Sequence, residues 1–294
     1  MKTIAGGNTF ELRSGELRAE ILTPWSTLYR KTRFARAGFV KDLWLGEICF
    51  TQPEGGPAGM TGTGGAGLCS EYKCPEIEMD SAVGAPFLKI GVGVLERTAD
   101  PWTIVDERRV DGLDTTVQAG QDAAVFECVS PEVNGYAYRE KRTLTLRGQR
   151  LRQEIELENR GGKPMTFSEY CHNFVSLGGL AIDETHQLEL LCAKMLPNAL
   201  DQPFIATPRG GGWTGPVEAS FRSECEEIPW QGPRAWRLSS SRTSVSIAED
   251  VDFEPVKVYL WGTPFCACAE VFAGFTIQPG ETARWSREWC VTGK

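Results

Sequence analysis

The sequence predicts an all-β protein, and three observations support this class. Short runs of alternating apolar and polar residues recur between Trp102 and Leu157, and turn residues separate them at intervals of about 8 to 14 residues, which is typical of a β-sandwich. No segment of comparable length shows the 3.6-residue period of an amphipathic helix. The 294 residues can bury a sizeable core, and we expect a single domain over residues 1–294.

Two hairpins are expected from alternation and turn chemistry. Residues Thr9–Arg13 and Leu17–Leu22 alternate apolar with polar side chains around a short turn that contains a glycine. Residues Arg150–Asn159 and Met165–Tyr170 flank a turn that contains two glycines and a proline. We therefore expect each pair of strands to be antiparallel neighbours.

Two glycine-containing segments follow the first hairpin, and the glycines predict a loop in one and a strand next to a ligand in the other. Thr51–Leu68 is rich in glycine and lacks the Gly-Lys-Ser/Thr of a phosphate-binding loop, so we expect a long rim loop. In Phe87–Leu95, alternation places four aliphatic side chains on one face and Phe87, Lys89 and two glycines on the other. Such a strand can form the floor of a cleft, with Lys89 pointing into it, because glycines let a ligand approach the backbone. The alternative is that Lys89 reaches past a bulge to solvent.

His172, one of only two histidines, lies beside Asn173 at the end of an expected strand. An imidazole can exchange a proton near neutral pH, and a neighbouring carboxamide can hold a hydroxyl-rich ligand. The alternative is a hydrogen-bonded core histidine. The second histidine, His186, lies on a strand whose other residues suggest no function.

Glu270 is the second candidate for chemistry, because it is the only acidic residue between Glu254 and Glu281. Its small and apolar neighbours in Cys266–Phe272 favour a raised pKa, which would allow the carboxylate to act as a base at neutral pH. The alternative is a structural ion pair with Arg33 or with the lysine of the glycine-containing strand.

Four segments in this order resemble the aldose 1-epimerase (galactose mutarotase-like) superfamily and span most of the chain. They are Tyr29–Phe34, Phe87–Leu95, the His-Asn-Phe sequence at 172–174, and Glu270–Glu281. The resemblance implies a large two-sheet antiparallel β-sandwich, the supersandwich. It also implies an enzyme without a cofactor that interconverts the anomers of an aldose or a sugar derivative.

The resemblance also implies roles for particular residues. His172 would be the acid that protonates the sugar ring oxygen, and Glu270 would be the catalytic base. Arg33 matches the family's Arg-Phe motif and would donate paired hydrogen bonds to sugar hydroxyls, although a solvated strand face is equally compatible with this basic segment. Glu71 resembles the acidic residue at the cleft edge, or is a surface carboxylate, and Asn173 and Lys89 would help to fix the sugar.

The chain departs from the better-known mutarotases at one position. Those proteins have a further histidine between the arginine segment and the middle of the chain, and this sequence has none there. Lys89 or Glu71 would take its place. Two other functions therefore stay open on the same fold: a carbohydrate-binding or regulatory protein without catalysis, and a different carbohydrate-active enzyme such as a lyase or hydrolase.

Composition restricts the partners. A formal charge of −8 argues against nucleic acid and favours a neutral small molecule, here a carbohydrate. No apolar run is long enough to cross a membrane and no export signal is visible, so we expect a cytoplasmic monomer or homodimer. The ten cysteines form no CxxC pair, so we expect mostly reduced, buried thiols and no metal site.

Overall fold

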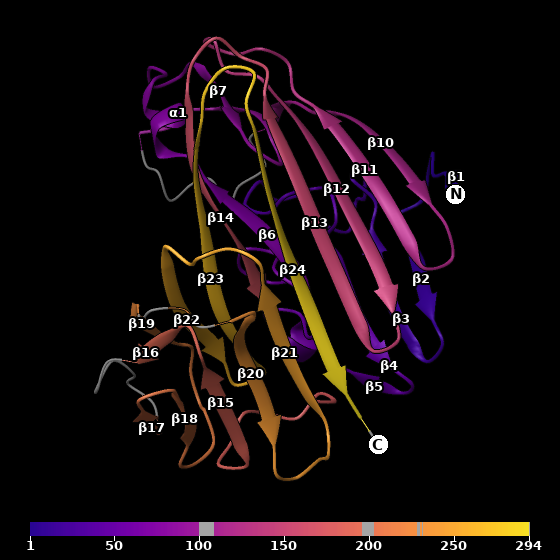
Figure 1. Cartoon of the computed structure of the whole chain (residues 1–294), viewed down its shortest axis with the longest axis vertical. Coiled ribbons are helices and arrows are strands. Elements are labelled where there is room, and N and C mark those ends of the chain that lie inside the picture. Colours follow the sequence, from indigo (N-terminus) through magenta and orange to yellow (C-terminus); the bar gives the residue numbers. More distant parts are fainter. Residues whose placement is uncertain (100–108, 196–202, 228–229, 231, 294) are drawn as a thin grey trace.

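Two large antiparallel β-sheets pack face to face, and a small third sheet lies at one end of the molecule (Figure 1). The structure is a computed structural model that describes residues 1–99, 109–195, 203–227, 230 and 232–293. The expected all-β class and the two-sheet sandwich are both confirmed. The expected strand at 102–105 lies outside the described residues.

The first sheet contains eleven strands. In spatial order they are β1 (Lys2–Thr3), β10 (Asp114–Ala119), β11 (Ala123–Val129), β12 (Tyr138–Arg147), β13 (Arg150–Asn159), β24 (Thr282–Thr292), β21 (Ser246–Val251), β20 (Arg234–Ser240), β15 (His186–Leu190), β18 (Gly210–Trp213) and β17 (Phe204–Thr207).

The second sheet contains ten strands. In spatial order they are β16 (Ala193–Met195), β19 (Phe221–Glu227), β22 (Lys257–Thr263), β23 (Cys266–Ile277), β14 (Met165–Asn173), β6 (Leu68–Lys73), β4 (Val40–Leu45), β3 (Leu17–Leu22) and β2 (Thr9–Ser14), with β5 (Ile48–Cys49) paired to β4.

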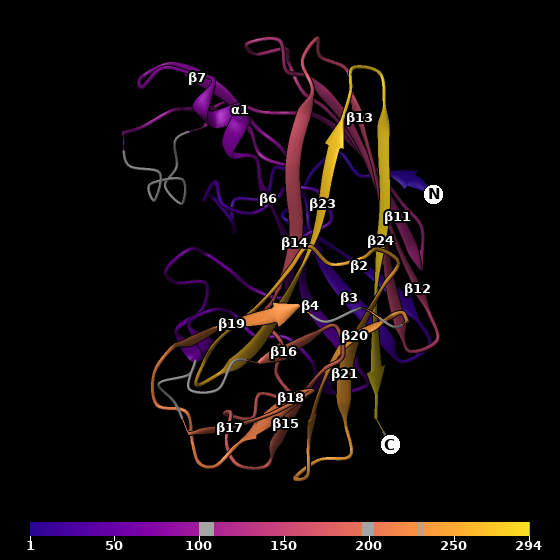
Figure 2. The same cartoon turned by 60° about the vertical axis from the view of Figure 1, so that its left-hand side comes forward.

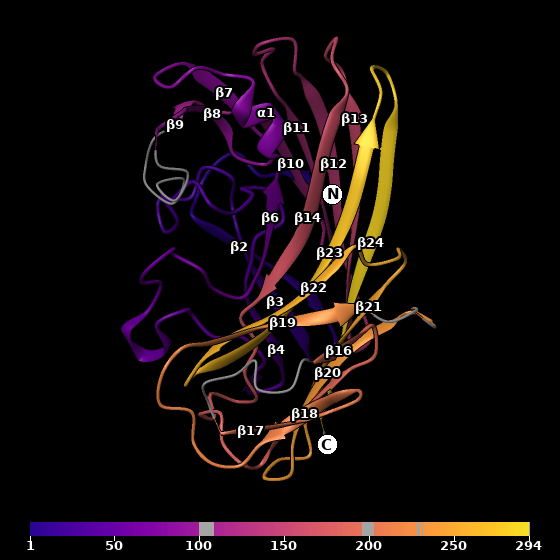
Figure 3. The same ribbon diagram turned by 90° about the vertical axis from the view of Figure 1, so that its left-hand side faces the viewer.

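The small sheet stands at the opposite end of the long axis from β15, β17 and β18 (Figures 1 and 3). Its strands are β7 (Pro86–Lys89), β8 (Gly93–Glu96) and β9 (Arg109–Asp111). The short helix α1 (Pro75–Met79) lies beside β7, and a 3₁₀ turn, η1 (Gly56–Ala58), lies within the glycine-rich loop. Among the described residues, no helix has the length and apolarity needed to cross a bilayer.

The two predicted hairpins had different outcomes. β2 and β3 pair antiparallel as expected, with Thr9 opposite Leu22. The second hairpin was a wrong prediction, because β13 pairs with β12 and β24 while β14 pairs with β23 and β6. The chain changes sheets at the intervening turn, where the Asn159 amide donates to Lys163 O and Ile277 O. Alternation reports a buried face but not the sheet to which it belongs.

The expected single strand Phe87–Leu95 was also a wrong prediction. It is a tight hairpin in which Phe87 pairs with Leu95 and Lys89 pairs with Gly93. Gly91 lies at the turn with φ 78°, a left-handed conformation that glycine adopts without strain. Its N–H donates to Tyr138 Oη at 2.7 Å, and its carbonyl accepts from the Arg36 N–H at 2.8 Å.

A buried polar layer joins the two sheets behind β14. Arg287 of β24 donates to Glu169 of β14 and to Glu249 of β21, each at 2.8 Å. All three side chains are fully buried. β23 and β24 are consecutive strands of opposite sheets, joined at one end of the molecule (Figure 2). The layer therefore fixes β14 and β23, the strands that carry the candidate site, against the first sheet.

All ten cysteines are free thiols, and eight of them are buried.

Candidate functional site

Two adjacent strands of the second sheet bring His172 and Glu270 into contact. His172 Nε2 of β14 lies 3.1 Å from Glu270 Oε1 of β23. On the other side of the ring, Nδ1 lies 3.0 Å from Sγ of Cys268, which is two residues before Glu270 on the same strand face. The Asn173 backbone N–H donates to the same sulfur at 2.9 Å. Both ring nitrogens therefore have a polar partner.

Aromatic rings enclose the imidazole. His172 stacks on Phe174 with ring centroids 4.1 Å apart, and the edges of Phe34 and Trp261 pack at 5.8 and 5.0 Å. Phe34 comes from the loop between β3 and β4, so that loop covers the strand face. His172 is 2% exposed and Glu270 is 5% exposed, which places the pair in a nearly dry environment.

Arg33 and Glu71 form a network beside this pair. Glu71 lies on β6, opposite Tyr170 of β14, and accepts from Arg33 Nε at 2.7 Å. It also accepts hydrogen bonds from Lys73 Nζ and the Tyr170 hydroxyl. Arg33 donates from its two terminal nitrogens to Thr63 and to Tyr170, both at 3.1 Å. The guanidinium is therefore held in one orientation next to the aromatic enclosure.

The proton of the pair lies on Glu270 rather than on His172 at neutral pH. Burial raises the pKa of Glu270 to about 8, and the nearby cations Arg33 and Lys73 oppose only part of this shift. Burial, together with the charge on Arg33, lowers the pKa of His172 well below its usual value. The contact therefore places a carboxylic acid beside a neutral imidazole, so the two groups hold a single proton between them and do not form an ion pair.

Glu71 has the opposite character. Burial alone would raise its pKa, but the cations Arg33, Lys73 and Lys89 hold the pKa of Glu71 well below its usual range. The site thus contains one fixed carboxylate and one carboxyl group that titrates near neutrality. Carboxyl groups with pKa values pushed apart in this way are typical of sites that perform acid–base chemistry.

Four of the residues proposed from the sequence lie together, and two others differ from expectation. Arg33, Glu71, His172 and Glu270 are brought to one region of the second sheet from distant parts of the chain. Asn173 is not part of this group. It points to the opposite face of β14, because successive residues of a strand alternate.

The Asn173 amide is fully used inside the sandwich. It donates to Ala269 O at 2.8 Å and to Glu249 at 3.2 Å, and it accepts from Trp289 Nε1 at 2.9 Å. No exposed surface remains on this residue, so the expectation that it binds sugar is corrected: Asn173 fixes β14 from behind.

Lys89 lies in the β7–β8 hairpin and not on a single continuous strand. It is 4% exposed, and its Nζ has no hydrogen-bond partner among the described residues. Its charge nevertheless reaches the site, since it contributes to the lowered pKa of Glu71.

His186 is fully buried, and its Nδ1 lies 3.0 Å from Asp183, a structural arrangement away from this site.

Cys268, Tyr170 and Lys73 belong to the site but were not predicted from the sequence. Alternation could have found the first two, because each lies two residues from a proposed site residue and therefore on the same strand face. Lys73 lies two residues after Glu71 in the same way. Phe34 stood in the Arg-Phe motif without a role of its own, and Trp261 carried no signal, because a different strand brings it to the site.

His172, Cys268 and Glu270 also offer three metal-ligand atoms within 4.8 Å of one another. A single ion would bind only one imidazole nitrogen, whereas here Nδ1 faces the thiol and Nε2 faces the carboxyl group. Burial raises the pKa of Cys268 well above its usual value, so the thiol keeps its proton. The arrangement therefore favours hydrogen bonding over metal coordination.

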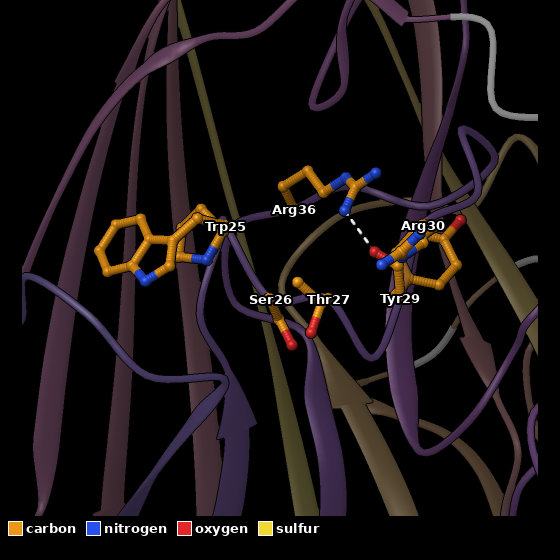
Figure 4. Close-up of a pocket in the computed structure, with 7 residues that line it drawn as sticks. Trp25, Ser26, Thr27, Tyr29, Arg30 and Arg36 are labelled. Carbon is orange, nitrogen blue, oxygen red and sulfur yellow. Dashed lines mark hydrogen bonds between the residues drawn. The ribbon is translucent and has the colours of Figure 1, made fainter.

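The loop that supplies Arg33 also borders a separate cavity of about 340 Å³ (Figure 4). Arg36 donates to Tyr29 O across it, and Trp25 lies on the opposite side of the view from Tyr29. Arg36 donates to Lys31 O as well, so its guanidinium braces the loop. Neither His172 nor Glu270 lines this cavity.

Solved structures with the same fold are known. A candidate aldose 1-epimerase from Escherichia coli K12 is 12% identical, with 97% of this chain and 99% of that chain covered and a TM-score of 0.62. An aldose epimerase homologue from C. elegans is 13% identical, with 98% and 99% covered and a TM-score of 0.57. A galactose mutarotase-like protein from Clostridium acetobutylicum is 12% identical, with 97% and 95% covered and a TM-score of 0.56.

A scan against protein-family models finds no match, and a search of curated proteins finds none either. The similarity to the three solved structures lies in the fold, which this chain shares with aldose 1-epimerase and galactose mutarotase-like proteins over nearly its whole length and at low sequence identity.

Proposed function

We propose that this protein is a sugar mutarotase that needs no cofactor, and that His172 and Glu270 are its acid–base pair. The observation that carries the proposal is the 3.1 Å contact between Nε2 and Oε1, buried under aromatic rings and holding one proton. The fold shared with aldose epimerase homologues supports the same reaction class.

Ring opening of a cyclic aldose requires two proton transfers. One group takes the proton of the anomeric hydroxyl while another protonates the ring oxygen, so the bond from C1 to the ring oxygen breaks and an aldehyde forms. The aldehyde rotates about its bond to C2, and ring closure reverses both transfers. Each half-reaction moves one proton across the pair, so a pair that holds one proton returns to its starting state.

The expected roles, Glu270 as base and His172 as acid, require the proton to lie on His172 when ring opening begins. In the ligand-free site the raised pKa of about 8 keeps it on Glu270. The 3.1 Å separation of Glu270 Oε1 and His172 Nε2 is short enough for the proton to pass to the imidazole. We therefore propose that Glu270 deprotonates the anomeric hydroxyl after this transfer.

Arg33 and Glu71 would hold the sugar hydroxyls. Arg33 keeps some exposed surface and is fixed by Glu71, Thr63 and Tyr170, so it can donate to a hydroxyl oxygen without being ordered first. The aromatic rings around His172 would pack on the apolar face of a sugar ring.

A second candidate is a carbohydrate-binding protein without catalysis. The near-complete burial of His172 and Glu270 favours it, because a substrate reaches them only if the covering loop moves. Exchange NMR on a panel of neutral and charged aldoses separates the two functions. Faster exchange between anomers than in buffer supports the mutarotase, and binding without faster exchange supports the binding protein.

A further inference from the structure

Positive charge is in excess around the site, although the chain as a whole carries a formal charge of −8. Arg33 and Lys73 share a single carboxylate, that of Glu71. Lys257 of β22 is a third cation, and it acts on the same carboxyl group, Glu270, as Arg33 and Lys73 do. Glu270 keeps its proton at neutral pH, so Glu71 is the one carboxylate that pairs with Arg33 and Lys73 among the described residues.

Lys89 adds a fourth cation, and it differs from the other three because it is buried without a hydrogen-bond partner among the described residues. Its side chain is almost fully buried, and Nζ makes no hydrogen bond with any of them. A buried ammonium group without a partner is strongly unfavourable, so such groups are rare unless a ligand satisfies them.

Lys89 and Lys73 line one cavity of about 150 Å³ at the end of β6, next to α1. Phe87 and Cys74 supply apolar walls. One carboxylate, Glu78, also lines the cavity, but it is partly buried and makes no hydrogen bond with Lys89 Nζ. The side chain of Lys73, which lines the cavity, is 42% exposed.

We propose that the ligand of this site is an anionic sugar whose phosphate or carboxylate group occupies this cavity and pairs with Lys73 and Lys89. The inference rests on the proposed function for the sugar itself, and on Lys89 and the local charge excess for the anionic group. It replaces the neutral ligand that the overall charge of the chain favoured.

The position of the cavity restricts where the group is attached. On β6, Lys73 lies four residues from Cys69, the residue opposite His172, which corresponds to about 13 Å along the strand. The anionic group therefore sits at the end of the sugar remote from the anomeric carbon. A monosaccharide is shorter than this, but the Lys73 side chain reaches back along the strand, since its Nζ bonds Glu71. A 6-phosphate or a uronic acid carries its charge at that end of the ring, and both leave the anomeric hydroxyl free for ring opening.

Calorimetric titration of the full chain with glucose, glucose 6-phosphate and glucuronate, and with the galactose counterparts, tests the proposal. We expect at least one anionic sugar to bind at least tenfold more tightly than its neutral parent. The better of the two anionic forms identifies the group as phosphate or carboxylate.

Three variants locate the group. Lys89→Met and Lys73→Met should each reduce the preference for the anionic sugar at least tenfold, and Glu78→Gln should increase it, because it removes a competing negative charge from the cavity. Lys141→Met is the matched control: this lysine pairs with Glu156 on the other sheet and should have no effect. Lys89→Met should fold, because it replaces an unpaired buried charge by an apolar chain of similar length.

Equal affinity for neutral and anionic sugars overturns the inference, and so does a preference that survives in both lysine variants. Neither result affects the mutarotase proposal, which is judged by the rate of anomer exchange. A different outcome separates the two proposals. If a sugar phosphate binds tightly and the binding depends on the lysines, but anomer exchange is not accelerated, the proposed anionic ligand is supported and the proposed mutarotase activity is overturned.

Discussion

At the scale of single residues, the site depends on where one proton resides. Glu270 and His172 are close enough to share it. Burial raises the pKa of Glu270, which favours its protonated form, and lowers the pKa of His172, which favours its unprotonated form. A carboxyl group in water would have lost this proton at neutral pH. The enclosure by aromatic rings is therefore part of the chemistry as well as of the packing.

The pH dependence of kcat/KM for anomer exchange should reflect this shared proton. We expect a bell-shaped profile, because activity requires the pair to hold one proton. Above a pH of about 8 the pair loses it as Glu270 ionises, and well below pH 6.5 a second proton adds to His172. A rate that continues to rise from pH 8 to pH 10 would contradict the assignment.

Cys268 should influence catalysis without contacting the substrate. Its sulfur is the partner of His172 Nδ1, so Cys268→Ala leaves a buried nitrogen unsatisfied, at a cost of about 1–3 kcal/mol. We expect an approximately tenfold lower kcat and a displaced acid limb of the pH profile in Cys268→Ala, with both restored toward wild type in Cys268→Ser. An unchanged pH profile in a folded Cys268→Ala protein would show that the thiol only fills space.

At the scale of elements, alternation explains both the successes and the errors of the sequence analysis. It correctly predicted the first hairpin, and it placed His172 and Glu270 on strands. Used consistently, it would have excluded Asn173, which must face away from His172. It could not distinguish a strand from a tight hairpin in Phe87–Leu95, because the two glycines that suggested a cleft floor instead allow the turn.

Gly91 should therefore be a stability position. A Cβ at Gly91 would lie 2.7 Å from Ala35 Cβ and would also be strained by the positive φ. We expect Gly91→Ala to destabilise the fold by more than about 2 kcal/mol in urea unfolding. Gly84→Ala is the control. Gly84 has a similar φ of 85°, but a Cβ added there would meet no atom within 4 Å. This substitution therefore measures the backbone strain alone, and we expect it to lower the free energy of unfolding by about 1 kcal/mol. Equal effects of the two substitutions would contradict the hairpin packing.

At the scale of the whole molecule, the two sheets are joined by a buried ionic layer as well as by apolar packing. Arg287 binds Glu169 from the second sheet and Glu249 from the first. Composition and alternation predicted the sandwich class, but the sequence could not show which strands pair or that the chain changes sheets after Asn159. Those choices depend on contacts between residues more than a hundred positions apart, such as Arg287 with Glu169.

Arg287→Met should destabilise the protein strongly, by about 3–5 kcal/mol in urea unfolding, because it leaves two buried carboxylates without a counter-ion. Arg284→Met on the same strand is the control. Its side chain is 67% exposed and pairs with the half-exposed Glu156, so we expect little change. A small effect at Arg287 would mean that the layer does not hold the sheets together.

The most direct test of the central claim is anomer exchange of the substrate by Glu270→Gln and His172→Asn, measured by exchange NMR alongside sugar affinity. Each substitution should reduce the rate by about 10²- to 10⁴-fold, the contribution of a positioned proton-transfer group, while affinity stays within about tenfold. Glu156→Gln, on the other sheet, should leave both unchanged. If the double variant exchanges anomers at the wild-type rate, His172 and Glu270 are not the acid–base pair.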